Sequence, residues 1–368
     1  MTKAAELAKM GEVLTNSQIG GRRNIVINGA MQVAQRGTSQ TGVTADGYYA
    51  APDRYKLQPN SAGTWSVSQS TTSPSGFANS YKVECTTADA SLSSGDFVLF
   101  EQRFEGQNVQ HLKKGTSSAE SITVSFWVRS AKTGTYIVEI DDHDNSRNIN
   151  KSYTISSADT WEHKTITFEG DTTGALDNDN NFSLRVIFWL AGGSDFSSGT
   201  LATSWQSTVN ANRVVGQVNL ADTVGNDWYV TGIQLEVGSQ ATPFEHRSLG
   251  DELLLCQRYY QQLGSFPIVV ISGGNCQGVT QARVIMRAAP TVSTDGNTGR
   301  ITDCNAADFE SSALNPAVTA NAYTQTGVGW ISARFQGFGF SGSPTSGDPG
   351  VFLPSGTSGK PLEMDAEL

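Results

Sequence analysis

The stretch SITVSFWVRS, residues 121–130, places an apolar side chain at every second position. Successive side chains of a β-strand point to opposite faces, so this spacing predicts a strand with one buried face. That face carries Ile122, Val124, Phe126 and Val128. Trp127 and Arg129 fall on the opposite face, where the sequence sets an aromatic ring near a cation.

The stretch FSLRVIFWL, residues 182–190, repeats this arrangement, with Arg185 and Trp189 opposite its apolar face. Two explanations remain open for the outward Trp and Arg side chains. In the first, loops, the N-terminal segment or a neighbouring subunit cover them as a second buried layer. In the second they form a ligand platform, because indole faces stack on sugar rings and Arg binds hydroxyls or carboxylates. The candidate ligand-binding residues are then Trp127, Arg129, Arg185 and Trp189.

The fold class predicted for the whole chain is mostly β. Short strand patterns separated by Gly, Ser, Asn and Asp recur between residues 24 and 245 and predict an antiparallel sandwich, with a domain over 23–247. Residues 248–264 predict one linking helix, with Asp251 and Glu252 in its first turn and Gly264 at its end. Residues 265–368 predict a second, smaller β domain. The 38 glycines and the charged fraction of only 16% fit β structure with many turns.

Residues 1–22 predict a short helical anchor, in which Leu7, Met10 and Leu14 lie on one apolar stripe. A helix of this length is marginal alone and needs a surface on which to dock. The linking helix is apolar on most sides, which indicates a place between domains or between subunits. Both features favour an oligomer.

The stretch RNIVINGAMQVAQRGTS, residues 23–39, contains Asn-Gly, the dipeptide typical of a tight β-hairpin. A hairpin at Asn28-Gly29 would set apolar residues against amides on the buried side. Read straight through, the odd positions are apolar and the even positions mostly polar, which predicts one long strand. Gly29 then marks a bulge or a place where another backbone comes close.

Composition and charge exclude several classes of function. The net charge of −10 argues against a nucleic-acid partner and against an anionic membrane surface. The longest apolar runs, such as FPIVVI at 266–271, are too short to span a bilayer. The cysteines are far apart in sequence, a spacing that predicts neither a disulfide framework nor a zinc site. We expect them to be small buried residues and the protein to be made in a reducing cytoplasm. They are Cys85, Cys256, Cys276 and Cys304.

Several short motifs resemble catalytic or cofactor-binding motifs but lack the neighbouring residues that this chemistry needs. GFGFSG, residues 337–342, is not followed by a helix start, and GTSGKP, residues 356–361, lacks the hydroxyl that holds magnesium. His143, in the acidic stretch DDHDN, is more typical of a solvated turn than of a metal ligand. DNDNN, residues 177–181, has no EF-hand glutamate, although calcium held by separate loops stays open. We therefore expect no catalytic residue, no metal and no cofactor, and hence no enzyme.

Several segments, in the same order, resemble the tail-fibre and tail-appendage proteins of tailed bacteriophages. They are RNIVINGAMQVAQRGTS (23–39), PDRY (52–55), SFWVRS (125–130), TWEHKTITFEGDTTG (160–174) and VTGIQLEVGSQATPFEHRSLGDELLLCQRYYQ (230–261), with a weaker likeness in the final EMDAEL. The resemblance implies a jelly-roll domain like that of carbohydrate-binding modules, a location in the virion after assembly in the host cytoplasm, and a homotrimer.

The function that this resemblance implies is that of a tail fibre or fibre adaptor that helps the particle attach to the host surface through a glycan. The N-terminal helix, with Leu7, Met10 and Leu14, would then join the chain to other virion tail proteins. Two alternatives stay open. One is a head decoration or capsid fibre protein, which differs in where that helix docks. The other is a virion-bound enzyme that degrades surface polysaccharide.

Overall fold

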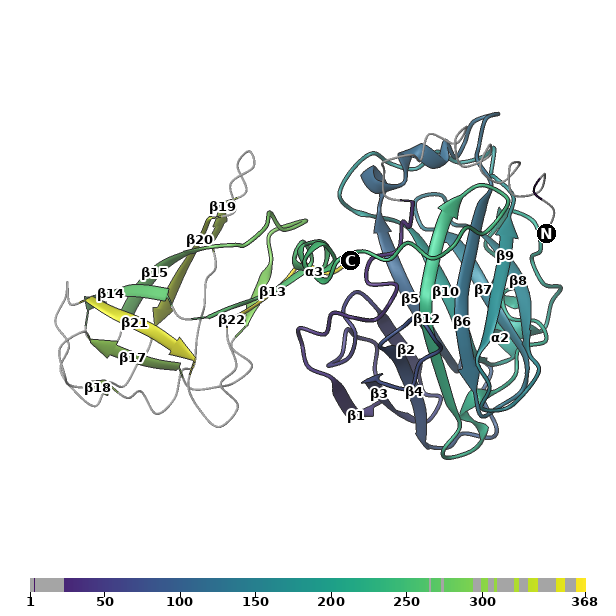
Figure 1. Cartoon of the computed structure of the whole chain (residues 1–368), viewed down its shortest axis with the longest axis horizontal. Coiled ribbons are helices and arrows are strands. Elements are labelled where there is room, and N and C mark those ends of the chain that lie inside the picture. Colours follow the sequence, from purple (N-terminus) through teal and green to yellow (C-terminus); the bar gives the residue numbers. More distant parts are fainter. Residues whose placement is uncertain are drawn as a thin grey trace. The chain divides into compact units, whose positions relative to one another are not determined.

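The computed structural model divides into two compact units, residues 1–252 with Leu368 and residues 253–367 (Figure 1). It describes residues 3, 23–264, 266–272, 275–293, 299–303, 308–309, 321–323, 330–336, 349–354 and 362–368. The predicted N-terminal helix with Leu7, Met10 and Leu14 lies outside these residues, as do GFGFSG and GTSGKP. In the part of the chain that is described, no helix is both long enough and apolar enough to cross a bilayer.

The first unit is a sandwich of two antiparallel sheets of six strands, as the alternating sequence pattern predicts, and the chain is mostly β with a jelly-roll architecture (Figure 1). The first sheet has the order β1-β3-β4-β12-β6-β9 and the second the order β11-β8-β7-β10-β5-β2. The strands of the first sheet are β1 (Ser39–Val43), β3 (Thr64–Ser70), β4 (Ser80–Thr87), β12 (Asp227–Val237), β6 (Ile122–Ser130) and β9 (Glu162–Phe168). Those of the second are β11 (Gln206–Ser207), β8 (Arg147–Ile155), β7 (Gly134–Asp142), β10 (Phe182–Gly192), β5 (Phe97–Glu105) and β2 (Lys56–Asn60).

The core lies between the two sheets and consists of the alternating apolar side chains. Val124, Phe126 and Val128 of β6 are fully buried, and Val186 and Phe188 of β10 are 1% exposed. The rings of Phe126 and Phe188 meet edge to face, with their centroids 5.0 Å apart. The predicted inward faces of both strands are therefore confirmed, and so is the prediction that the remaining side chains of these strands point away from this core.

Short helical turns connect the strands of the sandwich. They are η1 (Gly106–Asn108), η2 (Gln110–Leu112), α2 (Ser194–Ser197), η3 (Asn210–Asn212) and η4 (Leu220–Asp222). The segment with α2 and η3 lies against the outer side of the second sheet, because Phe196 and Val214 pack with Leu99 and Ile187. One outer face of the sandwich is thus partly covered by its own chain.

The prediction of a single long strand over residues 23–39 is wrong, because the backbone turns at Gly29 and Ala30. The amide of Met31 donates to the carbonyl of Asn28 at 3.0 Å, and both residues have left-handed φ, 56° and 60°. The buried side chain of Asn28 makes the hydrogen bonds to Val33 that the backbone of a neighbouring strand would otherwise make. Its Oδ1 accepts from the Val33 amide at 3.0 Å and its Nδ2 donates to the Val33 carbonyl at 2.8 Å. A side-chain amide that binds nearby backbone competes with strand formation.

The second half of that prediction, a close approach of another backbone at Gly29, is confirmed. A Cβ atom on Gly29 would lie 2.2 Å from the carbonyl oxygen of Ile233, a distance that no side chain tolerates. The carbonyl of Gly29 in turn accepts from the Ile233 amide at 3.0 Å. Only glycine fits at this contact between the N-terminal segment and β12.

The linking helix is shorter than predicted. Helix α3 (Leu249–Gln257) begins with Ser248 as its cap, since the Asp251 amide donates to Ser248 Oγ at 3.1 Å. The prediction that it continues to Gly264 is wrong, because β13 (Tyr260–Leu263) is a strand that pairs with β22 (Leu362–Asp365). The backbone groups of β13 are satisfied by a partner about a hundred positions later, which no local pattern reveals.

The second unit is also β-rich in its described parts. One sheet has the order β13-β22-β16, with β16 at Thr291–Ser293. A larger sheet has the order β18-β17-β21-β14-β15-β20-β19. Its strands are β18 (Asp308–Phe309), β17 (Gly299–Asp303), β21 (Pro349–Pro354), β14 (Phe266–Ser272), β15 (Asn275–Gln281), β20 (Trp330–Gln336) and β19 (Asn321–Tyr323). The prediction of a second β region beyond residue 265 agrees with these strands.

Candidate functional site

A pocket of about 470 Å³ lies on the outer face of the first sheet, away from the sandwich core. Strands β6, β9 and β12 contribute to it, together with the β3–β4 connection and the segment that follows β12. Its lining consists of Ser75, Gly76, Phe77, Ser125, Trp127, His163, Thr165, Gly232, Ala241, Thr242, Pro243, Phe244 and His246. The size falls within the range typical of small-ligand sites.

Trp127 reaches the pocket because the pleat of β6 points it outward while Phe126 and Val128 point into the core. On one side its strand partner is His163 of β9, and the two rings are 5.1 Å apart. On the other side it pairs with Thr231 of β12. Trp127 is half-buried, so part of the indole remains accessible to a ligand.

Gly232 keeps the base of the pocket open. The register between β12 and β6 shifts between Thr231 and Gln234, as in a β-bulge, and Gly232 has the left-handed φ of 61°. A Cβ atom there would lie 2.7 Å from Cζ of Phe77 and 3.2 Å from Cδ1 of Trp127. Glycine therefore leaves space between two rings that any other residue would fill.

Another part of the lining is a cluster of three rings from two separate segments. Phe77 lies 5.1 Å from Phe244 and 5.3 Å from His246, and Phe244 lies 4.8 Å from His246, all between ring centroids. Phe77 and Phe244 are half-buried, while His246 is exposed at the rim. The pocket thus presents apolar ring surfaces from several directions and two imidazoles.

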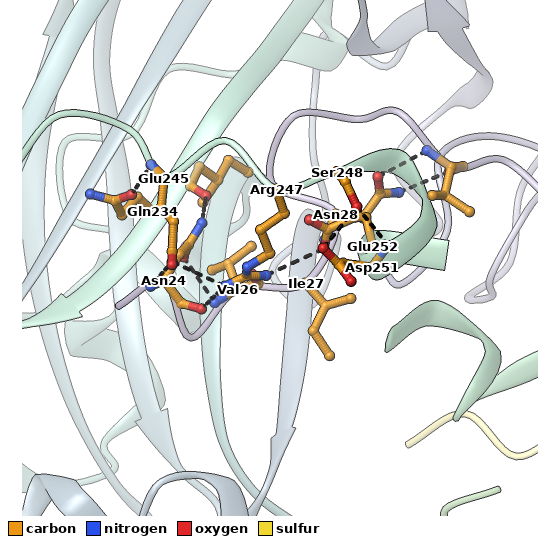
Figure 2. Close-up of polar contacts among 12 residues, drawn as sticks. Asn24, Val26, Ile27, Asn28, Gln234, Glu245, Arg247, Ser248, Asp251 and Glu252 are labelled. Carbon is orange, nitrogen blue, oxygen red and sulfur yellow. Dashed lines mark hydrogen bonds and ion pairs between the residues drawn. The ribbon is translucent and has the colours of Figure 1, made fainter. Parts of the chain in front are cut away.

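The segment that carries Phe244 and His246 is fixed by the N-terminal stretch of the sandwich, as Figure 2 shows. Arg247 donates from its guanidinium to the carbonyl of Val26 at 3.1 Å and also to that of Asn24. Glu245 accepts from the Asn24 amide at 2.7 Å, and its own amide donates to Gln234 Oε1 at 2.8 Å. Residues 24–26 therefore hold both neighbours of His246 in place.

A second set of bonds fixes the wall at Thr242. The Thr242 amide and hydroxyl donate to the two carboxylate oxygens of Glu236, at 2.8 and 2.6 Å. Arg23 and Gln234 donate to the Thr242 hydroxyl at 3.1 and 3.2 Å. The buried carboxylate of Glu236 is therefore satisfied by protein donors, the amide and hydroxyl of Thr242 and Nε2 of Gln234 at 2.9 Å.

The electrostatic character of the pocket is close to neutral. Of the thirteen described residues that line it, none is Asp, Glu, Lys or Arg, and the titratable ones are His163 and His246. Partial burial lowers the pKa of the His163 imidazole, so this ring is neutral at pH 7. The polar side-chain atoms of the lining are hydroxyls and imidazole nitrogens, which can donate or accept a hydrogen bond according to their protons, and the Trp127 indole Nε1–H, which only donates.

The four predicted ligand residues do not form one platform. Trp127 lines the pocket on the first sheet, and Arg129 lies on the same outer face of β6. Arg129 donates from Nη2 to Asp159 Oδ1 at 2.8 Å, and its guanidinium lies over the Tyr229 ring. Trp189 and Arg185 belong to β10 of the second sheet and point to the opposite side of the sandwich.

The prediction that Trp189 offers an open face to a ligand is wrong, because the ring is fully buried. Phe196 of α2 and Val214, which follows η3, cover it. Its Nε1 donates to Glu139 Oε2 at 2.7 Å, and Arg213 lies over the ring at 4.9 Å while donating to Glu139 Oε1 at 2.7 Å. The sequence left open that loops cover the outward Trp and Arg side chains as a second buried layer. At Trp189 this alternative is confirmed.

Arg185 is also engaged within the protein. It donates to Asp141 Oδ2 at 2.8 Å and to Glu101 Oε2 at 2.7 Å, and 15% of its side chain is exposed. Both acids are buried, so this cation balances them on the outer face of the second sheet. Its geometry is that of an internal ion pair, and a role toward a ligand is a prediction that no contact supports.

The pocket residues that sequence reasoning missed are Phe77, His163, Phe244 and His246. Phe77 lies in a Ser- and Pro-rich connection, and Phe244 and His246 follow the last strand of the sandwich. The motif TPFEH, residues 242–246, concentrates two rings where a loop would normally be polar, and this was the available signal. Nothing local joins these positions to Trp127.

The acidic loops considered for metal binding are tied to each other and to neighbouring side chains. The Asp177 amide donates to Asp144 Oδ2 at 3.0 Å, and the His143 ring stacks on Phe182 with centroids 4.2 Å apart. Among the described residues, no group of three or more His, Cys, Asp and Glu side chains is placed to hold a metal ion.

No sequence-family model matches the chain, and no curated protein matches it either. Among solved structures, the enzymatically active domain of tailspike protein 4 of bacteriophage CBA120 is similar over 58% of this chain and 21% of that one, with 11% identity and a TM-score of 0.31. The carbohydrate-binding module TmCBM61 in complex with β-1,4-galactotriose is similar over 59% of this chain and 100% of that one, with 8% identity and a TM-score of 0.30. A family 11 carbohydrate-binding module of a Clostridium thermocellum cellulase covers 55% and 99%, with 11% identity and a TM-score of 0.27. Likeness at this level assigns neither a family nor a ligand, so the pocket itself has to carry the functional argument.

Proposed function

We propose that the sandwich is a glycan-binding module and that the pocket on its first sheet seats a sugar ring. The observation that carries the proposal is that the half-buried indole of Trp127 lines one pocket with the rings of Phe77 and Phe244, and that Gly232 leaves space between Trp127 and Phe77. Aromatic faces pack on the C–H side of a sugar ring, and the hydroxyls and imidazoles around them can bind its hydroxyl groups.

The biological setting that we propose is a tailed-phage particle, with the chain as a tail fibre or fibre adaptor that is not an enzyme. The order of the segments from RNIVINGAMQ to the TPFEHRSLGDELLL region supports this role. One shallow site binds a sugar weakly, and three copies in a homotrimer would raise the avidity by about 10² to 10⁴ when they engage one surface together. Attachment to other virion proteins would fall to the N-terminal residues Leu7, Met10 and Leu14.

The test of glycan binding compares two tryptophan variants of the full chain. Trp127→Ala removes the ring in the pocket, whereas Trp161→Ala removes another half-buried Trp that lies outside the lining and packs on Tyr229. We expect Trp127→Ala to lose binding to host cells and to their surface polysaccharide, while Trp161→Ala keeps it. Equal binding by both variants and the unmodified chain would contradict the proposal.

The test of the virion role is to locate the chain in intact particles with a labelled antibody. Label at the tail supports a fibre or adaptor. Label at the head would instead support the alternative of a decoration or capsid fibre protein, and absence of label would contradict the virion role altogether.

A further inference from the structure

Among the described residues that line the pocket, none is Asp, Glu, Lys or Arg. The described lining contains no carboxylate, ammonium or guanidinium, although the chain as a whole carries a net charge of −10. Resting on the proposed function, we infer that the pocket selects an uncharged sugar ring over the same ring bearing a carboxylate. The aromatic contacts are the same for both sugars, so the selection comes from the cost of placing a carboxylate in a lining without a matching charge.

The charged side chains next to the pocket each have partners within the protein. On β9, the neighbours of His163 pair with each other, Lys164 Nζ lying 2.6 Å from Glu162 Oε2. On β6, Arg129 pairs with Asp159 at 2.8 Å. Next to the lining segment 241–246, Glu236 accepts from Thr242, and Glu245 accepts from Asn24 and lies 3.4 Å from Arg247. Arg23 donates to Thr242 Oγ1 at 3.1 Å and to the Pro243 carbonyl at 3.4 Å.

A carboxylate moved from water into this pocket would lose hydration and meet no cation among the described lining residues, since the guanidinium of Arg23 beside the pocket already donates to Thr242 Oγ1 and to the Pro243 carbonyl. Burying an unpaired charge is strongly unfavourable, and the negative potential of the whole chain adds a repulsive contribution. The nearest titratable groups are the two imidazoles, and partial burial lowers the pKa of His163, which keeps that ring uncharged at pH 7. A neutral sugar meets none of these costs.

The remaining polar groups suit sugar hydroxyls. Ser125 lies at the base of the pocket, whereas Thr165 and the rings of His163 and His246 lie at its exposed rim. Hydroxyls and the uncharged imidazole of His163 both donate and accept hydrogen bonds, which is also true of a sugar hydroxyl. A carboxylate at pH 7 only accepts hydrogen bonds, so it could pair with the donors at the rim but not with the acceptors.

The experiment compares methyl glycosides of glucose, galactose, mannose and N-acetylglucosamine with the matching uronic acids of the first three. Affinities for the full chain at pH 7.5 are measured by saturation-transfer NMR titration. We expect the neutral ring of the pair that binds best to bind at least about tenfold more tightly than its acid. We also expect its affinity to change less than about twofold between about 50 and about 300 mM salt, since screening acts on charged partners.

Two variants make the outcomes separable. Trp127→Ala is expected to abolish binding of the neutral ring, and Thr165→Lys, which adds a cation at the exposed rim, is expected to reduce the preference for it. Equal or tighter binding of the acid that depends on Trp127 would overturn the inference and leave glycan binding standing. Absence of any Trp127-dependent binding across the panel would overturn the proposed function itself.

Discussion

Replacing Trp189 by alanine tests the distinction between the two outward-facing tryptophans. The ring is fully buried between β10 and the connection that follows it, in contact with Phe97 and Phe196. Truncating a buried Trp to Ala removes its packing and leaves a cavity, which costs about 3 to 5 kcal/mol. The lost bond from Nε1 to Glu139 places the expected value toward the upper end of that range.

A graded series separates packing from hydrogen bonding at this position. Trp189→Phe keeps an aromatic ring and removes the Nε1 donor, so it is expected to lose about 1.5 to 3 kcal/mol, the contribution of a hydrogen bond to a charged group. Glu139 keeps its other donors, Arg213 and Asn150, in both variants. Trp127→Ala is the matched control, because its ring is only half-buried, and its cost is expected to stay below about 1.5 kcal/mol.

The assay is urea unfolding of the full chain followed by far-UV circular dichroism, with the midpoint and slope fitted for the transition that Trp189→Ala shifts. The expected order of stability is unmodified chain, Trp127→Ala, Trp189→Phe and then Trp189→Ala. A Trp189→Ala variant within about 1 kcal/mol of the unmodified chain would refute the burial argument, as would a Trp127→Ala variant that is equally destabilised.

Three further predictions follow from single contacts. Gly29→Ala is expected to destabilise the sandwich by about 2 to 3 kcal/mol in the same urea assay, because its Cβ would meet the Ile233 carbonyl oxygen at 2.2 Å. The control Gly250→Ala, whose nearest neighbour is 3.9 Å away, should be neutral or slightly stabilising. Similar effects of the two variants would contradict the close approach. Burial raises the pKa of the Cys85 thiol to about 11, so at pH 8 it stays protonated and should resist iodoacetamide in the folded chain but react in urea, as mass spectrometry of its peptide would show; rapid modification of the folded chain would be the opposite result. Binding of the neutral glycoside should weaken as the pH falls from about 7 to about 5, because burial lowers the pKa of His163 and a bound sugar would bury the ring further, so that protonation opposes binding. His163→Gln should remove this pH dependence. Tighter binding at low pH would contradict the prediction.

The sandwich was predictable because its strands carry their own periodicity. In β6 and β10 the inward residues follow the two-residue repeat, and both strands are found where the repeat places them. The stretch at 23–39 has the same repeat yet forms a turn, since the buried amide of Asn28 binds Val33 and supplies the bonds that a neighbouring strand would otherwise give. Helix α3 ends early because β13 pairs with β22, a contact with no local trace.

The candidate site was predictable at Trp127 alone, and the reason is physical. The alternation in β6 shows that this ring leaves the core, but coverage of an outer face depends on which loop folds over it. Phe196 of α2 and Val214, which follows η3, cover Trp189, while near Trp127 the bulge at Gly232 leaves a hollow between rings. Those outcomes are set by contacts between distant segments.

The measurement that bears most directly on the central claim follows the indole N–H signals of the seven tryptophans in ¹⁵N-labelled protein while the neutral methyl glycosides are added. Trp127→Ala and Trp189→Phe assign the two signals in question, since each variant lacks one of them. The account predicts that a glycoside that binds shifts the Trp127 signal in a saturable way and leaves that of Trp189, fully buried on the other sheet, in place. A saturable response that spares Trp127, or no response to any glycoside, would contradict the assignment of this pocket as a glycan site.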